Sequence, residues 1–373
     1  MVKATPTHTA DSTAEKRLNL AGEDADQLRH YYSQMLLIRR FEERAGEMYT
    51  KAKIGGYCHL NLGEEATIVG LTAALEPSDY IFTNYREHGY ILARGVAPGQ
   101  VMAELFGKET GVSRGRGGSM HLFDSTAHFM GGYAIVGGQL PLATGAAYAL
   151  KYQGKPGIVV CQMGDATTNI GAWHESLNLA ALWKLPIIYL IVNNGYGMGT
   201  AVAEGSAEPD LYKRGCAFRM HGERVDGRDV LAVRDAVLRL RRRAEVEHEP
   251  AILEAFSFRF RGHSVIDADR YRDPEEVKQG RAADPVALFA QQLLEAQVID
   301  NGWLKETASR VEREVHEAID FAEQSPAPKL ETLYDHIYAT PVSNAPGQVE
   351  AEMLAQQLEK EGRYARTDLP PGA

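Results

Sequence analysis

The chain has 373 residues, of which 44% are hydrophobic and 24% charged, as is typical of a globular protein with a sizeable core. Its formal net charge of −10 argues against a general nucleic-acid or anionic-membrane surface, because both require a basic face. No apolar stretch is long enough to span a membrane. The three cysteines, Cys58, Cys161 and Cys216, form no C-x-x-C pair and indicate a reducing compartment without a disulfide framework.

The two ends of the chain lack the apolar periodicity of its centre. Residues 1–26 mix basic and acidic side chains and contain no apolar segment, so we expect neither a secretory signal nor a transit peptide there. We expect a mobile polar arm over 1–26, one α/β domain with a helical C-terminal part over 27–340, and a tail over 341–373. The same features predict a cytoplasmic protein.

Apolar periodicity predicts two helices and a strand at the start of the domain. Residues recurring at helical spacing predict a helix from about residue 26 to 53, and a second helix follows "NLGEE". The segment "YIFTN" (80–84) predicts a short strand. It enters a predicted loop that carries Tyr85, Arg86 and His88.

Two glycine-rich segments follow this strand. The first, 107–121, is also basic, which fits either a mobile loop near an anion or a flexible surface loop. The second, "GGYAIVGG" (131–138), predicts a bend that leads into the helical pattern "QLPLATGAAYALKY". On residue types alone, the two interpretations of the first segment are equally good.

The centre of the chain predicts a parallel sheet. "GIVVCQM" (157–163) and "PIIYLIV" (186–192) are near-continuous apolar runs, typical of strands buried on both faces, with an amphipathic helix over about 170–183 between them. Further elements continue the alternation: a helix over about 228–247, a strand over 251–258 and helices beyond about 285. The predicted fold class is α/β, a doubly wound and mostly parallel sheet flanked by helices, with a helical C-terminal part.

Polar residues follow both central strands, at the position where α/β proteins bind ligands. "GD" (164–165) follows the first strand and "NN" (193–194) the second, and a βαβ crossover brings these strand ends side by side. A carboxylate and an amide oxygen suit a hard cation such as Mg²⁺, which would in turn hold phosphate groups. For Asp165 alone, the alternative is a turn residue that caps the next helix.

Other ligand-binding motifs are incomplete. The dinucleotide fingerprint G-x-G-x-x-G does not follow the first strand, and "GYGMGT" (195–200) lacks its last glycine. The phosphate loop G-x-x-x-x-G-K-[ST] is absent, and "HESLN" (174–178) has Asn178 where a zinc-protease motif needs its second histidine. These departures disfavour a nicotinamide-dependent dehydrogenase.

The pattern of Asp165 and Asn194 around a buried βαβ unit resembles the thiamin diphosphate-binding motif. Longer segments, spread in order over residues 26–335, resemble the α subunits of 2-oxo acid dehydrogenase E1 components, especially those of pyruvate dehydrogenase. These segments are "GGYCHLNLGEEA", "NYREHGY", "GRGGSMHLF", "AIVGGQLPLATGAA", "NLAALWKLP", "NNGYGMGT", "DLYKRG" and "FRFRGHSVID" followed by "YRDPEE". Several motifs in matching order make the resemblance specific, whereas "GD" and "NN" alone would be a weak signal.

The resemblance implies a role for each matching position. Asp165, the side chain of Asn194 and the main-chain carbonyl of Tyr196 would hold Mg²⁺. His59 would lie near the substrate, and His263 would handle a proton or contact the diphosphate. The further residues expected to contact thiamin diphosphate are Tyr85, Arg86, Ala134, Val136, Ala166, Thr167 and Arg259. Without the resemblance, His59 fits equally well as a hydrogen-bonded core histidine and Arg259 as a surface ion-pair partner.

The resemblance also implies an activity and partners. The expected reaction is the oxidative decarboxylation of a small 2-oxo acid, with transfer of the two-carbon unit to a lipoyl group on an E2 acyltransferase. The chain contains a single "GD" and "NN" unit and no second α/β copy to supply the carboxylate that activates the aminopyrimidine ring. We therefore expect an inactive single chain and an α₂β₂ heterotetramer with an E1 β subunit as the working enzyme.

Two alanines depart from the family pattern. The family usually has glycine after the aspartate and before the Ile-Val pair, whereas this chain has Ala166 and Ala134. If either position needs a positive φ, alanine would cost about 1 kcal/mol or more. The alternatives left open are an acetoin or branched-chain 2-oxo acid dehydrogenase E1 α subunit, and a non-catalytic homologue.

Overall fold

A computed structural model describes residues 20, 22–333, 335, 357 and 360 of the chain. Most of the arm expected over 1–26 and all but two residues of the tail expected over 341–373 lie outside these residues. The proposed division of the chain therefore stays a prediction. Among the described residues, every helix is too short or too polar to cross a membrane.

Six parallel strands form the central sheet, in the order β2-β1-β3-β4-β8-β7. Their bounds are β1 Tyr80–Asn84, β2 Phe129–Tyr133, β3 Val159–Gly164, β4 Ile187–Asn193, β7 His221–Asp226 and β8 Ala251–Phe256. The chain runs outward from β1 to β2 and then returns to place β3 on the other side of β1. This reversal between β1 and β3 is the switch point at which doubly wound sheets bind ligands.

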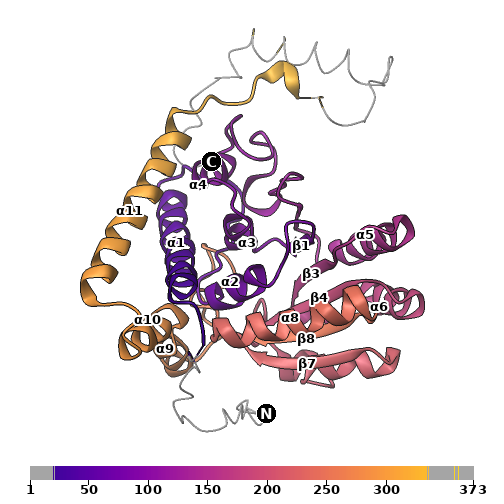
Figure 1. Cartoon of the computed structure of the whole chain (residues 1–373). Helices are drawn as coiled ribbons and strands as arrows, with labels where there is room; N and C mark the ends of the chain where they lie inside the picture. The colour runs from indigo at the N-terminus through magenta and orange to yellow at the C-terminus, as the bar shows by residue number, and fades with distance from the viewer. Residues whose placement is uncertain (1–19, 21, 334, 336–356, 358–359, 361–373) are drawn as a thin grey trace.

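Helices cover both faces of the sheet (Figure 1). One face packs against α5 (Gln139–Gln153) and α6 (Gly171–Trp183), with Cys161 and Tyr189 among the strand residues that fill this layer. The opposite face packs against helices from both halves of the chain: α1 (Ala25–Thr50), α2 (Glu65–Ala73), α3 (His88–Ala93), α4 (Pro98–Leu105) and α8 (Val230–Val246). The two layers confirm the doubly wound α/β fold.

The C-terminal helices extend the second layer. They are α9 (Pro274–Ala282), α10 (Pro285–Glu295) and α11 (Asn301–Gln324), and α11 lies along α1 and α4 (Figure 1). Short elements complete the described chain: β5 (Tyr196–Gly197), β6 (Thr200–Ala201), α7 (Val202–Gly205) and the 3-10 turns Gly118–Met120, Asp165–Asn169, Leu211–Phe218 and Leu330–Thr332. The strand pair β5-β6 is antiparallel and follows β4 directly, so it projects from the carboxyl edge of the sheet.

The buried central elements agree with the sequence-based prediction, and the exposed or glycine-containing ones do not. Helices α3, α4 and α9 and strands β2 and β7 were not predicted. Strand β2 contains two glycines, and β7 is an edge strand whose residues are mostly part-exposed, so neither has an apolar run. His88 begins helix α3 and is fully buried, which corrects its placement in a loop.

Candidate functional site

Asp165, Asn194 and Tyr196 meet at the carboxyl edge of the sheet. Strands β3 and β4 pair in register up to Gly164 and Val192, so the residues that follow leave the sheet side by side. The Asp165 side chain is only 4% exposed. Burial raises the pKa of its carboxyl group to about 6, and the backbone N–H of Asn194 is among the groups that partly oppose this rise. The predicted pairing of the two strand ends is therefore present.

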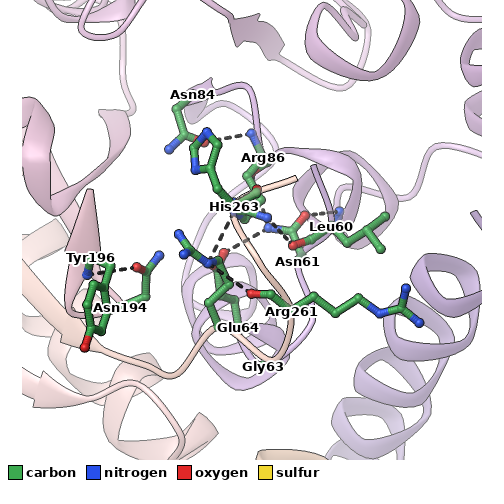
Figure 2. A network of polar contacts seen from close by, with 12 residues as sticks. Leu60, Asn61, Gly63, Glu64, Asn84, Arg86, Asn194, Tyr196, Arg261 and His263 are labelled. Carbon is green, nitrogen blue, oxygen red and sulfur yellow. Dashed lines mark hydrogen bonds and ion pairs between the residues drawn. The ribbon is translucent and has the colours of Figure 1, made fainter. Parts of the chain in front are cut away.

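The turn after β4 has a defined shape. Asn194 accepts a hydrogen bond from the backbone N–H of Tyr196 at 3.3 Å on Oδ1, as Figure 2 shows. Gly197 lies directly against the 165–166 segment, because a Cβ added there would be 2.4 Å from the Ala166 Cβ and 3.8 Å from Asp165 Oδ2. The Tyr196 hydroxyl donates to Glu276 at 2.9 Å. The turn is thus fixed on one side by Asp165 and on the other by α9.

The two alanines that depart from the family pattern adopt ordinary backbone conformations. Neither Ala134 nor Ala166 is among the described non-glycine residues with a positive φ. Ala166 is exposed at the strand end, while Thr167 next to it is buried. The cost expected from a positive φ therefore does not arise at either position.

Two arginines converge beside this turn. Arg86, which follows β1, donates to the carbonyls of Leu60 at 2.5 Å and His263 at 2.8 Å (Figure 2). Arg259, which follows β8, donates to the carbonyls of Met198 and Arg261. Both side chains are buried, and burial together with the charge of Arg86 lowers the pKa of Arg259. Arg259 is thus not the surface ion-pair partner that its sequence alone allowed.

Three aromatic rings cluster next to the arginines. The ring of His59 lies 4.4 Å from that of Tyr85 and 5.0 Å from that of His263, between centroids. Burial, followed by the charge of Arg86, lowers the pKa of His59 to about 2 and that of His263 to about 4. Both imidazoles are therefore neutral near pH 7. The buried Nδ1 of His59 has no hydrogen-bond partner among the described residues.

Ala134 and Val136 lie further along the same edge, after β2, with β1 between them and β3. No hydrogen bond or ring contact among the described residues joins them to the arginines or to Asp165. Exposed apolar residues follow strands β2, β4 and β8, namely Val136 with Ile135 (78%), Met198 (64%) and Ile266 (62%), and we call this set the apolar rim. The motifs in the sequence predicted which residues lie at this edge of the sheet, but they did not predict the apolar rim.

Two buried carboxylates near the site were also missed. Glu64 lies 3.8 Å from Arg86 Nε and accepts a hydrogen bond from Asn61 at 3.0 Å (Figure 2). Burial raises the pKa of Glu64. Glu254 lies on β8 and contacts Asn193, directly before Asn194. The signal available in the sequence was an acidic residue inside an apolar strand, "AILEAF", which is rarely placed there without a partner.

The described residues contain no group of three or more His, Cys, Asp or Glu side chains arranged to hold a metal ion. The arrangement around Asp165 is of another kind, with one carboxylate, one amide and a main-chain carbonyl, and with two buried cations beside it. Such a set suits a cation that brings further oxygen ligands of its own, such as phosphate oxygens.

Comparisons with known proteins agree with this geometry. The family model described as "Dehydrogenase E1 component" matches residues 33–331. A protein of Rhizobium meliloti is 43% identical over 82% of this chain and 88% of its own length, and one of Zymomonas mobilis is 45% identical over 84% and 89%. A protein of Rickettsia bellii is 42% identical over 82% and 94%. All three are named pyruvate dehydrogenase E1 component subunit alpha, and the chain belongs to the dehydrogenase E1 component family.

Proposed function

We propose that this chain is the α subunit of the E1 component of a pyruvate dehydrogenase and that it binds thiamin diphosphate through Mg²⁺. The observation that carries the proposal is the meeting of Asp165, Asn194 and the buried arginines at the switch point of the sheet, in a chain over 40% identical to named α subunits. The acetoin, branched-chain and non-catalytic alternatives have no observation in their favour. We further propose a cytoplasmic location.

The residues present fit both the cofactor and the metal. Arg86 and Arg259 are two buried cations whose charges disfavour each other, and an anionic diphosphate would relieve this repulsion. Burial disfavours the ionised form of the Asp165 carboxylate, and a divalent cation would offset that cost. Asp165, Asn194 Oδ1 and the Tyr196 carbonyl are oxygen donors, which Mg²⁺ prefers.

The bound cofactor would supply the electron sink for decarboxylation. The residues of this chain bind, orient and shield it. Arg86 and Arg259 would hold the diphosphate, and His59 offers a buried Nδ1 without a hydrogen-bond partner to a polar group of a bound molecule. His263 is neutral near pH 7 and its low pKa disfavours holding an extra proton, so its imidazole would relay a proton between its two ring nitrogens or contact the diphosphate. Tyr85 packs against both histidines.

The apolar rim is an argument for the presence of a partner subunit. Ile135, Met198 and Ile266 are exposed and follow strands β2, β4 and β8 in the chain, and exposed apolar residues grouped at one site are typical of a protein–protein interface. We propose that an E1 β subunit covers this rim, completes the site in an α₂β₂ heterotetramer and supplies the activating carboxylate. A lipoyl-bearing E2 would then receive the two-carbon unit.

The test is co-expression with a candidate β chain, followed by assays with pyruvate, acetoin and a branched 2-oxo acid in the presence of thiamin diphosphate and Mg²⁺. We expect turnover of pyruvate by the complex and none by the α chain alone. Robust turnover by the α chain alone would refute the subunit proposal. A complex that forms but prefers acetoin or a branched substrate would refute pyruvate as the substrate.

A further inference from the structure

The two asparagines after β4 make different contacts. Asn194 carries the amide oxygen proposed to hold Mg²⁺. Asn193 is buried, donates from Nδ2 to Glu254 at 2.7 Å and accepts the backbone N–H of Gly195 on Oδ1 at 2.9 Å. Asn193 therefore connects the sheet to the first residue of the turn that leads to Tyr196. Its contacts fix the backbone on both sides of Asn194.

The carboxylate of Glu254 accepts the hydrogen bond that the Asn193 side chain donates. Glu254 is fully buried on β8, and its carboxylate also accepts hydrogen bonds from Arg224 at 3.1 Å and from the backbone N–H of Tyr212 at 3.1 Å. Arg224 comes from the edge strand β7 and pairs with Asp210 as well, at 2.8 Å. A charge-assisted hydrogen bond holds its acceptor in place more firmly than a neutral one. Glu254 thus links strands β4, β7 and β8 next to the turn.

A buried carboxylate is a costly way to stabilise a sheet, here with a partner, Arg224, whose side chain is 37% exposed. Well-packed hydrophobic residues of similar volume are often as stable as a buried ion pair, or more stable. The neighbours of Glu254 on the same strand, Leu253 and Ala255, are fully buried apolar residues. Its stability contribution therefore does not explain Glu254, whereas the hydrogen bond to Asn193 gives it a use that an apolar side chain lacks.

We infer that Glu254 is a positioning residue, which acts through Asn193 to hold the turn that presents Asn194 and the Tyr196 carbonyl to Mg²⁺. The inference rests on the proposed function, because it assigns these two oxygens to the metal. Outer partners of metal ligands commonly act in this way, by fixing the orientation of a ligand that they do not replace. Glu254 itself does not need to contact the metal or the cofactor.

The experiment uses the assembled α/β complex and three variants: Glu254→Gln, Asn193→Ala and the double variant. Glu254→Gln keeps the size of the side chain and one acceptor oxygen, and Arg224 retains Asp210. Mg²⁺ is titrated in the presence of thiamin diphosphate by calorimetry. We expect each single variant to weaken Mg²⁺ binding about tenfold or more, as is usual when an outer partner of a metal ligand is lost.

The double variant separates positioning from a structural role. If Glu254 acts through Asn193, the double variant binds Mg²⁺ about as weakly as Asn193→Ala alone, because both changes act on the same contact: glutamine makes the charge-assisted bond a neutral one and alanine removes it. Additive losses would overturn the inference, as would Mg²⁺ affinity unchanged in Glu254→Gln. Should Glu254→Gln fail to fold, Asn193→Ala, which leaves the Glu254–Arg224 pair in place, still decides whether the contact orients the turn.

A second readout needs no cofactor. Hydrogen exchange of the metal-free complex should speed up across residues 194–200 in Glu254→Gln. The matched control is Glu223→Gln on β7, which removes a part-exposed partner of Arg239 and should leave this segment unchanged. If the wild-type complex binds no cofactor, the proposed function fails. Unchanged exchange in Glu254→Gln, with wild-type cofactor binding intact, refutes the positioning role alone.

Discussion

The glycine-rich segment 107–121 is built around a carboxylate of the protein itself. Glu104, the penultimate residue of α4, is fully buried and accepts hydrogen bonds from four backbone N–H groups of this segment. The donors are Ser113 and Gly115 on one oxygen, both at 2.8 Å, and Gly117 and Gly118 on the other, at 2.7 and 3.1 Å. We predict that Glu104→Gln releases this segment while the sheet stays folded.

The magnitude follows from the number of donors. Glutamine offers one acceptor oxygen, so two of the four N–H groups would face an NH₂ group instead. Each buried donor left without an acceptor costs about 1–3 kcal/mol, so the closed segment loses about 2–6 kcal/mol relative to an open one in which water hydrates the donors. Since about 1.4 kcal/mol is a factor of ten, the open population should rise at least about tenfold.

Limited trypsin digestion measures this opening, because Arg114 and Arg116 lie within the segment. We expect faster cleavage there in Glu104→Gln, with little change in the thermal unfolding temperature. Glu109→Gln is the matched control, since Glu109 lies in the same stretch and accepts none of the four bonds. Equal cleavage rates in Glu104→Gln and the wild type would refute the reasoning. The loop carries Ser119, whose hydroxyl accepts a hydrogen bond from the backbone N–H of His59 at 3.4 Å, so its opening should also disturb the site.

Three further predictions concern the site. Asp165→Asn should abolish Mg²⁺-dependent binding of thiamin diphosphate in calorimetry without lowering the unfolding temperature of the metal-free complex, because a neutral amide replaces a buried carboxylate; retained binding would contradict the assignment. Gly197→Ala should weaken cofactor binding, because the new methyl would lie 2.4 Å from that of Ala166, and Ala166→Gly should restore it. Failure of this rescue would show that the two segments are not in contact. Burial lowers the pKa of His263 from 6.5 to about 4, so the unfolded chain binds more protons between these values and the wild type should lose stability as the pH falls from 6.5 towards 4. The unfolding temperature of His263→Gln should depend less on pH over this range, and an identical dependence would argue against a buried neutral imidazole.

The sequence by itself determined the fold class and the position of the proposed metal site. Strands β3 and β4 are continuous apolar runs, and the crossover between them obliges Asp165 and Asn194 to share one edge of the sheet. Both inferences need only local pattern and the handedness of βαβ units. The polar edge strand β7 and the glycine-containing β2 could not be predicted in this way, because neither has an apolar run.

Only the tertiary structure decided what surrounds these residues. The sequence could not say whether Ala166 and Ala134 needed a positive φ, because backbone dihedrals depend on the packing of the whole turn. The sequence left open whether the basic segment 107–121 is a mobile loop near an anion or a flexible surface loop, and in the structure its backbone N–H groups bond the Glu104 carboxylate. The hydrogen bond that Asn193 donates to Glu254 joins residues 61 positions apart. Long-range contacts of buried charged groups follow from three-dimensional packing, which a single sequence specifies but does not display.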